Sequence, residues 1–252
     1  MTVQTPDKVM KIGLLQTGQN RSELAGFDEY PALFDQLLNT GQQTRWCELV
    51  TYRVLDNEFP DEIRDCEGYI VTGSAAGVYE DHDWMDPLMA FIRACHEAGI
   101  PQLGICFGHQ AIAKALGGAV EKWPGGWGVG VRRMTLCDQP GFMDAGKDSL
   151  DLIYFHQDQV TKLPDGAVRL ASSDFCIHGG FTLGDTVLCL QGHPEFEADY
   201  SAALLDAITS KVGEARAAAA QASLNQPTDA GAVAGWIEAF FTTAQAARGQ
   251  AA

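Results

Sequence analysis

The sequence of 252 residues has few basic side chains and no long apolar run. Lysine and arginine number 17 against 33 aspartates and glutamates, which gives a net charge of −16. A surface of this sign repels phosphate backbones and anionic lipids, so we expect neither a nucleic acid nor a membrane as partner. No segment approaches the roughly 20 consecutive apolar residues of a membrane span, and the N-terminus lacks the basic region and apolar core of a signal peptide. We therefore expect a cytoplasmic protein.

Cysteine motifs for metal binding or redox chemistry are absent as well. The seven cysteines are an odd number without Cys-x-x-Cys spacing, and several, such as Cys189, lie in apolar strand-like runs. This pattern argues against a disulfide framework and predicts buried, reduced thiols. The cysteines and histidines form no zinc-ligand pattern. The carboxylates beside His82 could suggest a metal site, but no matching ligand spacing follows, which favours a solvated loop over residues 78–86. We therefore expect no metal and no organic cofactor.

The hydrophobic content of 46% and the chain length suit one well-buried α/β domain. Apolar strand-like runs alternate with segments of helical periodicity, which predicts a three-layer fold with a mostly parallel central sheet flanked by helices. We expect a single domain over 1–252, with a core at about 9–200 and a helical C-terminal extension at about 201–252. The predicted strands are 9–16, 46–54, 68–71, 100–105, 131–136, 167–172, 175–183 and 187–190. The predicted helices are 27–38, 87–98, 111–116, 197–212, 217–224 and 232–247.

Cys106 stands between a predicted strand and a predicted helix, with Gly104 two residues before it and Gly108 two residues after it. A side chain thrust out of so tight a turn needs such neighbours, because a Cβ there would collide with the adjoining strand or helix. The arrangement is that of a nucleophile elbow with sulfur in place of oxygen. The helix N-terminus favours a thiolate, and the N–H of Phe107 is free to point at an oxyanion. A buried structural cysteine is the alternative.

A candidate base and its orienting acid follow the predicted strand 187–190. His193 lies at the end of this strand, Glu195 comes two residues later, and Pro194 stiffens the turn between them. The imidazole can face a thiol while the carboxylate holds its other nitrogen. A lone histidine at a strand end is more often structural, but together with Cys106 it indicates a nucleophile and its base.

At these residues the chain resembles the class I glutamine amidotransferases, the family with a Cys-His-Glu triad. The resemblance covers roughly residues 9–200, and within the family the chain is most similar to free-standing proteins like the amidotransferase domain of GMP synthase. It implies the flavodoxin-like fold of that family. Four segments carry it, in the family's order: Thr72-Gly73-Ser74, Gly104 to Gln110, His156 to Val160, and Gly192-His193-Pro194-Glu195.

The resemblance implies hydrolysis of the glutamine side-chain amide to glutamate and ammonia through a thioester on Cys106. His193 would be the base and Glu195 its orienting acid. Backbone N–H groups of Phe107 and of the turn at Gly73 and Ser74 would form the oxyanion hole. Many members of the family have Gly-Gly-Pro where this chain has Thr-Gly-Ser.

The resemblance also implies roles in substrate binding. Gln110 would help to bind glutamine, and a turn at Gly128-Val129-Gly130 would offer backbone groups to the amino-acid end of the substrate. A structural hairpin is the alternative for that turn, and the segment lacks the spacing of a nucleotide-binding loop. His156 would have a supporting or structural role next to the elbow.

Three functions remain open at this point. As a glutamine amidotransferase, the chain would deliver ammonia to a separate synthase subunit, because it has no second catalytic domain. As a γ-glutamyl peptide or conjugate hydrolase, it would use the same three residues and release a different leaving group. A non-catalytic ligand-binding or regulatory module is disfavoured, since such a module has no need of a nucleophile, base and orienting acid together.

Overall fold

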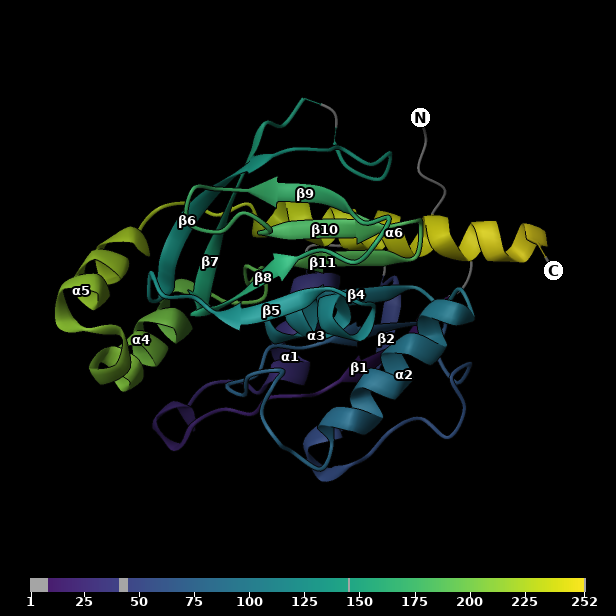
Figure 1. The fold of residues 1–252 in the computed structure, drawn as a ribbon, viewed down its shortest axis with the longest axis horizontal. Coiled ribbons are helices and arrows are strands. Elements are labelled where there is room, and N and C mark those ends of the chain that lie inside the picture. Colours follow the sequence, from purple (N-terminus) through teal and green to yellow (C-terminus); the bar gives the residue numbers. More distant parts are fainter. Residues whose placement is uncertain (1–8, 41–44, 145, 252) are drawn as a thin grey trace.

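The computed structural model describes residues 9–40, 45–144 and 146–251 (Figure 1). Its strands are β1 (Met10–Leu15), β2 (Cys47–Tyr52), β3 (Gly68–Val71), β4 (Gln102–Ile105), β5 (Ala119–Lys122), β6 (Gly128–Leu136), β7 (Ser149–His156), β8 (Asp158–Lys162), β9 (Val168–Ser172), β10 (Gly180–Leu183) and β11 (Val187–Leu190). Its α-helices are α1 (Tyr30–Asn39), α2 (Met85–Glu97), α3 (Phe107–Ala115), α4 (Ala198–Val212), α5 (Glu214–Ser223) and α6 (Ala230–Ala251). Short 3₁₀ helices span Ser22–Leu24 and Val54–Asp56.

The central sheet has the order β2-β1-β3-β4-β11-β10-β9-β6-β7. The five strands from β2 to β11 are parallel, and in chain order they follow the sequence 2-1-3-4-5 of flavodoxin-like folds. Ligands of such sheets bind at the carboxyl ends of the parallel strands. β3, β4 and β11 end on the same edge, so the loops that follow them meet there.

The other half of the sheet is antiparallel, from β11 through β10, β9 and β6 to β7. The three-layer α/β fold is confirmed, but the sheet is mixed rather than mostly parallel. The reason is the short connection between β10 and β11, which allows a hairpin and is too short for the crossover that parallel strands require. A separate two-stranded sheet pairs β5 with β8.

Helices cover both faces of the sheet, and alternate residues of each buried strand point to opposite sides. In β3, Ile70 packs in a core with Phe34 of α1 and Phe241 of α6. Its neighbours Tyr69 and Val71 pack in a second core with residues of α2 and α3. The strand needs apolar residues on both faces, which explains its unbroken apolar run.

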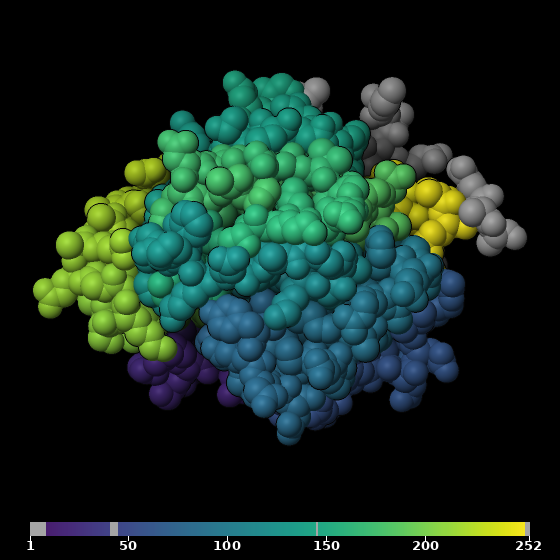
Figure 2. Space-filling model, viewed as in Figure 1, coloured from purple at the N-terminus to yellow at the C-terminus, as the bar shows by residue number. Residues whose placement is uncertain are grey.

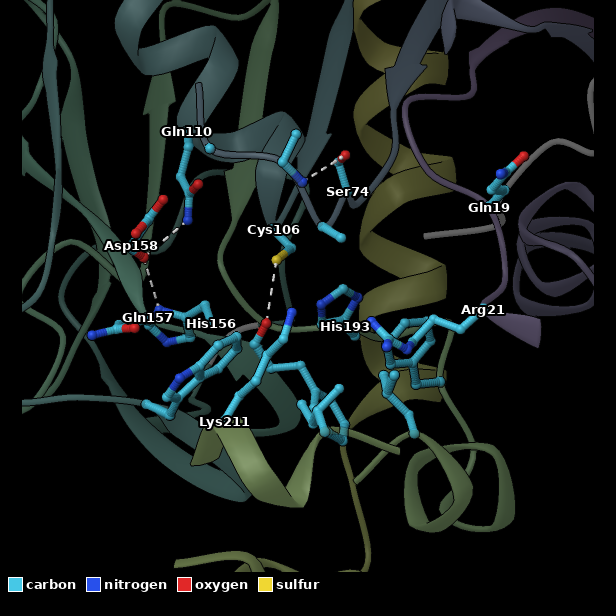
Figure 3. Close-up of a pocket in the computed structure, with 18 of the residues that line it drawn as sticks. Gln19, Arg21, Ser74, Cys106, Gln110, His156, Gln157, Asp158, His193 and Lys211 are labelled. Atoms are coloured by element: carbon cyan, nitrogen blue, oxygen red, sulfur yellow. Dashed lines mark hydrogen bonds between the residues drawn. The ribbon is translucent and has the colours of Figure 1, made fainter. Parts of the chain in front are cut away.

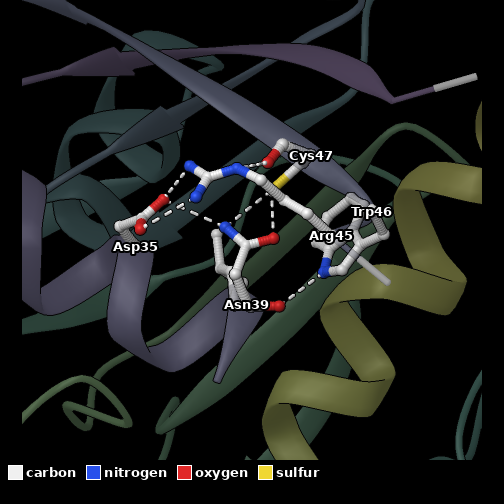
Figure 4. A network of polar contacts seen from close by, with 6 residues as sticks. Asp35, Asn39, Arg45, Trp46 and Cys47 are labelled. Atoms are coloured by element: carbon white, nitrogen blue, oxygen red, sulfur yellow. Dashed lines mark hydrogen bonds and ion pairs between the residues drawn. The ribbon is translucent and has the colours of Figure 1, made fainter. Parts of the chain in front are cut away.

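Helix α1 is fastened to the start of β2 by a polar network (Figure 4). The indole N–H of Trp46 donates to the carbonyl of Leu38 at 2.7 Å, and Arg45 pairs with Asp35. Trp46 is buried and packs against Phe241 of α6. These contacts fix the position of α1, whose first residue, Tyr30, lies at the candidate site.

Helices α4 and α5 lie at one end of the molecule (Figure 1), and α6 packs beside α1. Figure 2 shows α4 and α5, in yellow-green, beside the purple N-terminal region. The ring of Phe27 meets that of Tyr200 on α4 edge to face at 5.6 Å. The C-terminal helices are therefore packed against segments from the start of the chain. Among the residues placed in the structure, no helix has the length and apolar character needed to cross a membrane.

Two predicted boundaries differ from the structure in an informative way. Helix α3 begins at Phe107, four residues before the predicted start, because Cys106 itself is its N-cap. The predicted strand 175–183 is reduced to β10, Gly180–Leu183. The preceding residues form a loop, which is closed by a bond from the N–H of Ser173 to the carbonyl of Cys176.

Replacement of Gly108 by alanine is expected to destabilise the fold severely. A Cβ at Gly108 would lie 2.1 Å from the carbonyl oxygen of Val71. The two nearest atoms belong to the backbone of Val71, which cannot move aside as a flexible side chain can. We expect Gly108→Ala to lower the free energy of unfolding in urea by about 3 kcal/mol or more.

The matched control is Gly235→Ala in α6, where a Cβ meets nothing within 4 Å. Alanine is favoured over glycine in a helix, so this variant should gain about 0.5–1 kcal/mol. A Gly108→Ala protein as stable as the wild type would mean that α3 does not press on β3 as described.

Candidate active site

Cys106 occupies a strained turn at the end of β4. Its backbone φ of 53° and ψ of −102° lie in a region that residues other than glycine rarely adopt. A Cβ on Gly104 would stand 2.6 Å from the carbonyl oxygen of Gly108, so neither glycine of the elbow tolerates a side chain. The predicted nucleophile-elbow geometry is confirmed.

Backbone hydrogen bonds hold this turn from both neighbouring strands. The N–H of Cys106 donates to the carbonyl of Leu190 on β11 at 2.9 Å, and the N–H of Gly108 donates to that of Thr72 after β3 at 3.1 Å. Phe107 is the first residue of α3, so its N–H has no partner within the helix. That donor is therefore available beside the thiol, as an oxyanion hole requires.

His193 lies after β11 and is fixed on three sides. Its backbone N–H donates to the carbonyl of Ile153 on β7 at 2.8 Å, and Nδ1 of its imidazole is 2.7 Å from Oε1 of Glu195. The ring of Phe196 stacks on the imidazole at 4.0 Å with an angle of 4° between the planes. The bond to Glu195 leaves Nε2 for the thiol, which is the arrangement of a nucleophile, base and orienting acid.

The charge state of His193 follows from its two partners. Burial alone lowers the pKa of the imidazole, but the Glu195 carboxylate and the Cys106 side chain, which acts through its charge and a hydrogen bond, raise this pKa well above its usual value. His193 and Glu195 are both almost completely shielded from solvent. The imidazole of His193 can therefore hold a proton near neutral pH, as a proton donor to a leaving group must.

The turn after β3 completes the edge of the site. A Cβ on Gly73 would lie 3.0 Å from Cε1 of His193, so the histidine approaches this glycine as closely as a backbone allows. The hydroxyl of Ser74 accepts a bond from the N–H of Ala76 at 3.2 Å, which shapes the turn. Thr72 is buried, its hydroxyl is bonded to Thr17, and it is not among the residues that line the cavity at Cys106.

Gln110 lies on the opposite side of Cys106 from His193 (Figure 3). Its side-chain amide donates to the carbonyl of Asp158 at 2.9 Å and to Oε1 of Gln191 at 3.0 Å. Both of its N–H groups are therefore used within the protein. Gln110 holds the wall of the site together, and only its amide oxygen remains to accept a bond from a substrate.

His156 lies on this same side, and its Nδ1 donates to the carbonyl of Asp158 at 3.0 Å. Burial lowers the pKa of His156 to about 4, although the bond to the Asp158 carbonyl opposes the shift. His156 is therefore neutral near pH 7 and does not compete with His193 as a protonated partner of the thiolate.

The predicted turn at Gly128-Val129-Gly130 is wrong, because these residues begin β6 and pair with β7. The chain reverses earlier, at Gly126 with its φ of 86°. None of the three is among the residues that line the cavity at Cys106, so their predicted role in substrate binding has no support in the geometry. Gly130 instead faces Ser223 of α5, whose hydroxyl would be 2.4 Å from an added Cβ.

A cavity of about 470 Å³ opens over Cys106. It is lined by predicted site residues (Ser74, Cys106, Gln110, His156 and His193). Other lining residues escaped the sequence analysis, namely Arg21, Leu24, Tyr30, Trp127, Phe155, Phe196, Tyr200, Leu204, Ile208 and Lys211. The spacing of Tyr200, Leu204 and Ile208, four residues apart on one helix face, was the available signal, but it does not distinguish a cavity wall from core packing.

No group of three or more His, Cys, Asp or Glu side chains able to hold a metal ion occurs among the described residues. All seven cysteines are free thiols, and six of them are buried, as expected. Cys137 is the exposed exception. His82 contacts Glu80 and stacks on Trp84 within its loop.

Comparison with known proteins gives consistent results. The model of the family described as glutamine amidotransferase class-I matches residues 32–205. γ-Glutamyl peptidase 3 of Arabidopsis thaliana is 32% identical over 71% of this chain and 75% of that protein. The glutamine-hydrolyzing GMP synthase of Aromatoleum aromaticum is 34% identical over 61% of this chain, but the match spans only 30% of the synthase.

A solved structure supports the fold. A glutamine amidotransferase from Thermotoga maritima superposes with a TM-score of 0.71, covering 94% of this chain and 99% of that one. Its sequence identity is 16%, so this likeness concerns the fold alone.

Replacement of Glu195 by glutamine is expected to weaken the ion pair while keeping the shape of the triad. Without the carboxylate the pKa of His193 falls towards its usual value, so the pH dependence of Cys106 reactivity should shift by about one unit or more. The rate of Cys106 alkylation by iodoacetamide, followed against pH by peptide mass spectrometry, measures this shift.

The exposed Cys137 in the same samples is the internal reference, and its alkylation should not change. Glu197→Gln is the matched variant, since it removes one carboxylate two residues further along, outside the triad. An unchanged pH dependence of Cys106 in Glu195→Gln would contradict the proposed charge arrangement.

Proposed function

The chain belongs to the class I glutamine amidotransferase family, and on that premise we propose that it hydrolyses amides at the γ-carbonyl of a glutamyl group. Glutamine is the simplest such substrate, with glutamate and ammonia as products. The observation that supports this most directly is that Cys106 and His193, which is bonded to Glu195, line the same cavity. The protein is a cysteine hydrolase of the glutamine amidotransferase type.

In the first half-reaction, the Cys106 thiolate attacks the γ-carbonyl carbon and the carbonyl oxygen becomes an oxyanion. The N–H groups of Phe107 and of the Gly73–Ser74 turn stabilise this charge, and one such donor typically contributes about 3 kcal/mol. The tetrahedral intermediate collapses as the carbon–nitrogen bond breaks. The imidazolium of His193 gives its proton to the departing nitrogen, which leaves as ammonia or as an amine.

In the second half-reaction, the neutral His193 removes a proton from water, which attacks the γ-glutamyl thioester. The carbon–sulfur bond then breaks, glutamate is released, and the thiolate–imidazolium pair is restored. Glu195 keeps the imidazole in the orientation and tautomer that both steps need.

A second candidate substrate is a γ-glutamyl peptide or conjugate, because several relatives are named γ-glutamyl peptidases and are about a third identical to this chain over the matched residues. The same acyl half would bind, and only the leaving group differs. The cavity of about 470 Å³ has the size of sites that hold ligands much larger than glutamine. If ammonia is the product, we propose a separate synthase as its acceptor, because a matched relative is named glutamine-hydrolyzing GMP synthase.

Cys106→Ala tests the proposal. We expect release of glutamate from glutamine or from a γ-glutamyl amide to fall by about 10⁴-fold or more, since the nucleophile of a triad is essential to its chemistry. Rapid acid quenching of the wild type during turnover should reveal, by mass spectrometry, one γ-glutamyl group on the peptide that contains Cys106.

The control is Cys137→Ala, which removes an exposed thiol outside the site and should leave turnover as it was. Turnover by Cys106→Ala at the wild-type rate would refute the proposed mechanism.

A further inference from the structure

The glutamyl group and the leaving group of a substrate must extend from the γ-carbonyl carbon at Cys106 in different directions. His193 donates the proton that the departing nitrogen receives, so the leaving group has to lie on the side of His193. In Figure 3, Gln110, His156 and Asp158 lie on one side of Cys106, while His193 and Arg21 lie on the other. The polar side suits the charged amino-acid end of the glutamyl group. The His193 side is therefore where the leaving group goes.

The cavity on the side of His193 is bounded by an apolar wall, which we call the α4 bay. Aromatic rings form its rigid part: Phe196 packs on Tyr200 at 4.6 Å and on Tyr30 at 6.2 Å. Burial holds the pKa of Tyr30 well above its usual value, so this wall is uncharged. The bay consists of Leu24, Tyr30, Phe196, Tyr200, Leu204 and Ile208, all of which line the cavity.

Ammonia gains no binding free energy from such an apolar wall. It is a single heavy atom and fully polar, and it gains nothing from apolar surface. A leaving amine with a hydrocarbon side chain gains roughly 25 cal/mol for each Å² of apolar surface it buries. The bay therefore fits an amine with an apolar side chain.

Two cations border the bay in a chain where acidic residues outnumber basic ones by 33 to 17. Arg21 lines the cavity, and its Nε is buried without a hydrogen-bond partner among the described residues. The side chain as a whole is 37% exposed, and its guanidinium pairs with Glu23 at a long distance of 3.7 Å. Lys211, one turn beyond Ile208, also lines the cavity. A buried guanidinium N–H with no acceptor points to a missing anion, and a carboxylate matches it best.

Most of this arrangement lies outside the part of the chain that the family model matches. That match spans residues 32–205, whereas Arg21, Leu24 and Tyr30 precede it and Ile208 and Lys211 follow it. The triad lies inside the match. Part of the bay therefore comes from segments that flank the matched residues, while Phe196, Tyr200 and Leu204 lie within them.

We propose that the α4 bay is a leaving-group subsite. The preferred substrates are γ-glutamyl amino acids or peptides in which the residue after the glutamyl group has an apolar side chain and a terminal carboxylate, which Arg21 holds. This rests on the proposed function. In the first half-reaction, the amide carbon–nitrogen bond breaks as the Cys106 thioester forms, and the amine leaves with the proton of His193. In the second, water hydrolyses the thioester and glutamate is released.

The test compares glutamine, γ-glutamylleucine and γ-glutamylleucinamide as substrates of the wild type, Arg21→Gln and Arg64→Gln. Arg64 is the matched control, since it is an exposed arginine outside the cavity. We expect the wild type to have a kcat/KM at least tenfold higher for γ-glutamylleucine than for glutamine. Arg21→Gln should lower that ratio about tenfold, mainly through KM, and Arg64→Gln should not change it.

γ-Glutamylleucinamide separates a charge contact from a change of shape, because it keeps the side chain and lacks the carboxylate. Arg21→Gln should alter its kcat/KM less than twofold relative to glutamine. Equal losses for γ-glutamylleucine and its amide would overturn the role of Arg21. A wild type that prefers glutamine to γ-glutamylleucine would overturn the subsite but leave the proposed function standing. If no substrate is hydrolysed faster than by Cys106→Ala, the proposed function fails and the subsite with it.

Discussion

The backbone contact between α3 and β3 at Gly108 is the constraint on which the active site depends. The N–H of Gly108 bonds to the carbonyl of Thr72, and there is no room for a Cβ between the two segments. This contact holds Cys106 in a backbone conformation that costs about 1–3 kcal/mol in isolation. The same contact sets the N–H of Phe107 beside the turn at Gly73. Thiol, oxyanion donors and the adjoining loop thus follow from one packing arrangement.

His193 joins the two halves of the mixed sheet at this point. It follows the last parallel strand, and its backbone is bonded to Ile153 of the antiparallel half. Glu195 is fully buried, and a buried carboxylate is tolerated only when it is paired. Because the ring is held by Glu195 and Phe196 together, the imidazole is already oriented before a substrate arrives. This preorganisation is what makes a buried ion pair useful for catalysis.

The sequence was informative where local chemistry decides the structure. Gly104 and Gly108 predicted the elbow, and the apolar runs at 68–71 and 187–190 predicted β3 and β11 to the residue. The sequence was less informative where contacts between distant segments decide the structure. The family resemblance suggested a turn at Gly128-Val129-Gly130, but these residues pair with β7, and Gly130 is a glycine because α5 leaves no space for a side chain.

The α4 bay illustrates the same limit. Its aromatic and aliphatic residues have the spacing of ordinary core positions, and nothing local distinguishes a residue that packs in the core from one that lines a cavity. Arg21 carries no motif and comes close to His193 only through the fold. Such a site is defined by contacts between the two ends of the chain, so it becomes visible only in three dimensions.

The packing of α4 against the N-terminal region has an evolutionary consequence. Phe27 precedes the residues matched by the family model and packs on Tyr200 of the bay, and neither residue belongs to the triad. Mutations there can accumulate without disturbing the strained elbow. Descendants of one ancestral hydrolase can therefore diverge in the metabolites they accept while inheriting the same chemistry unchanged.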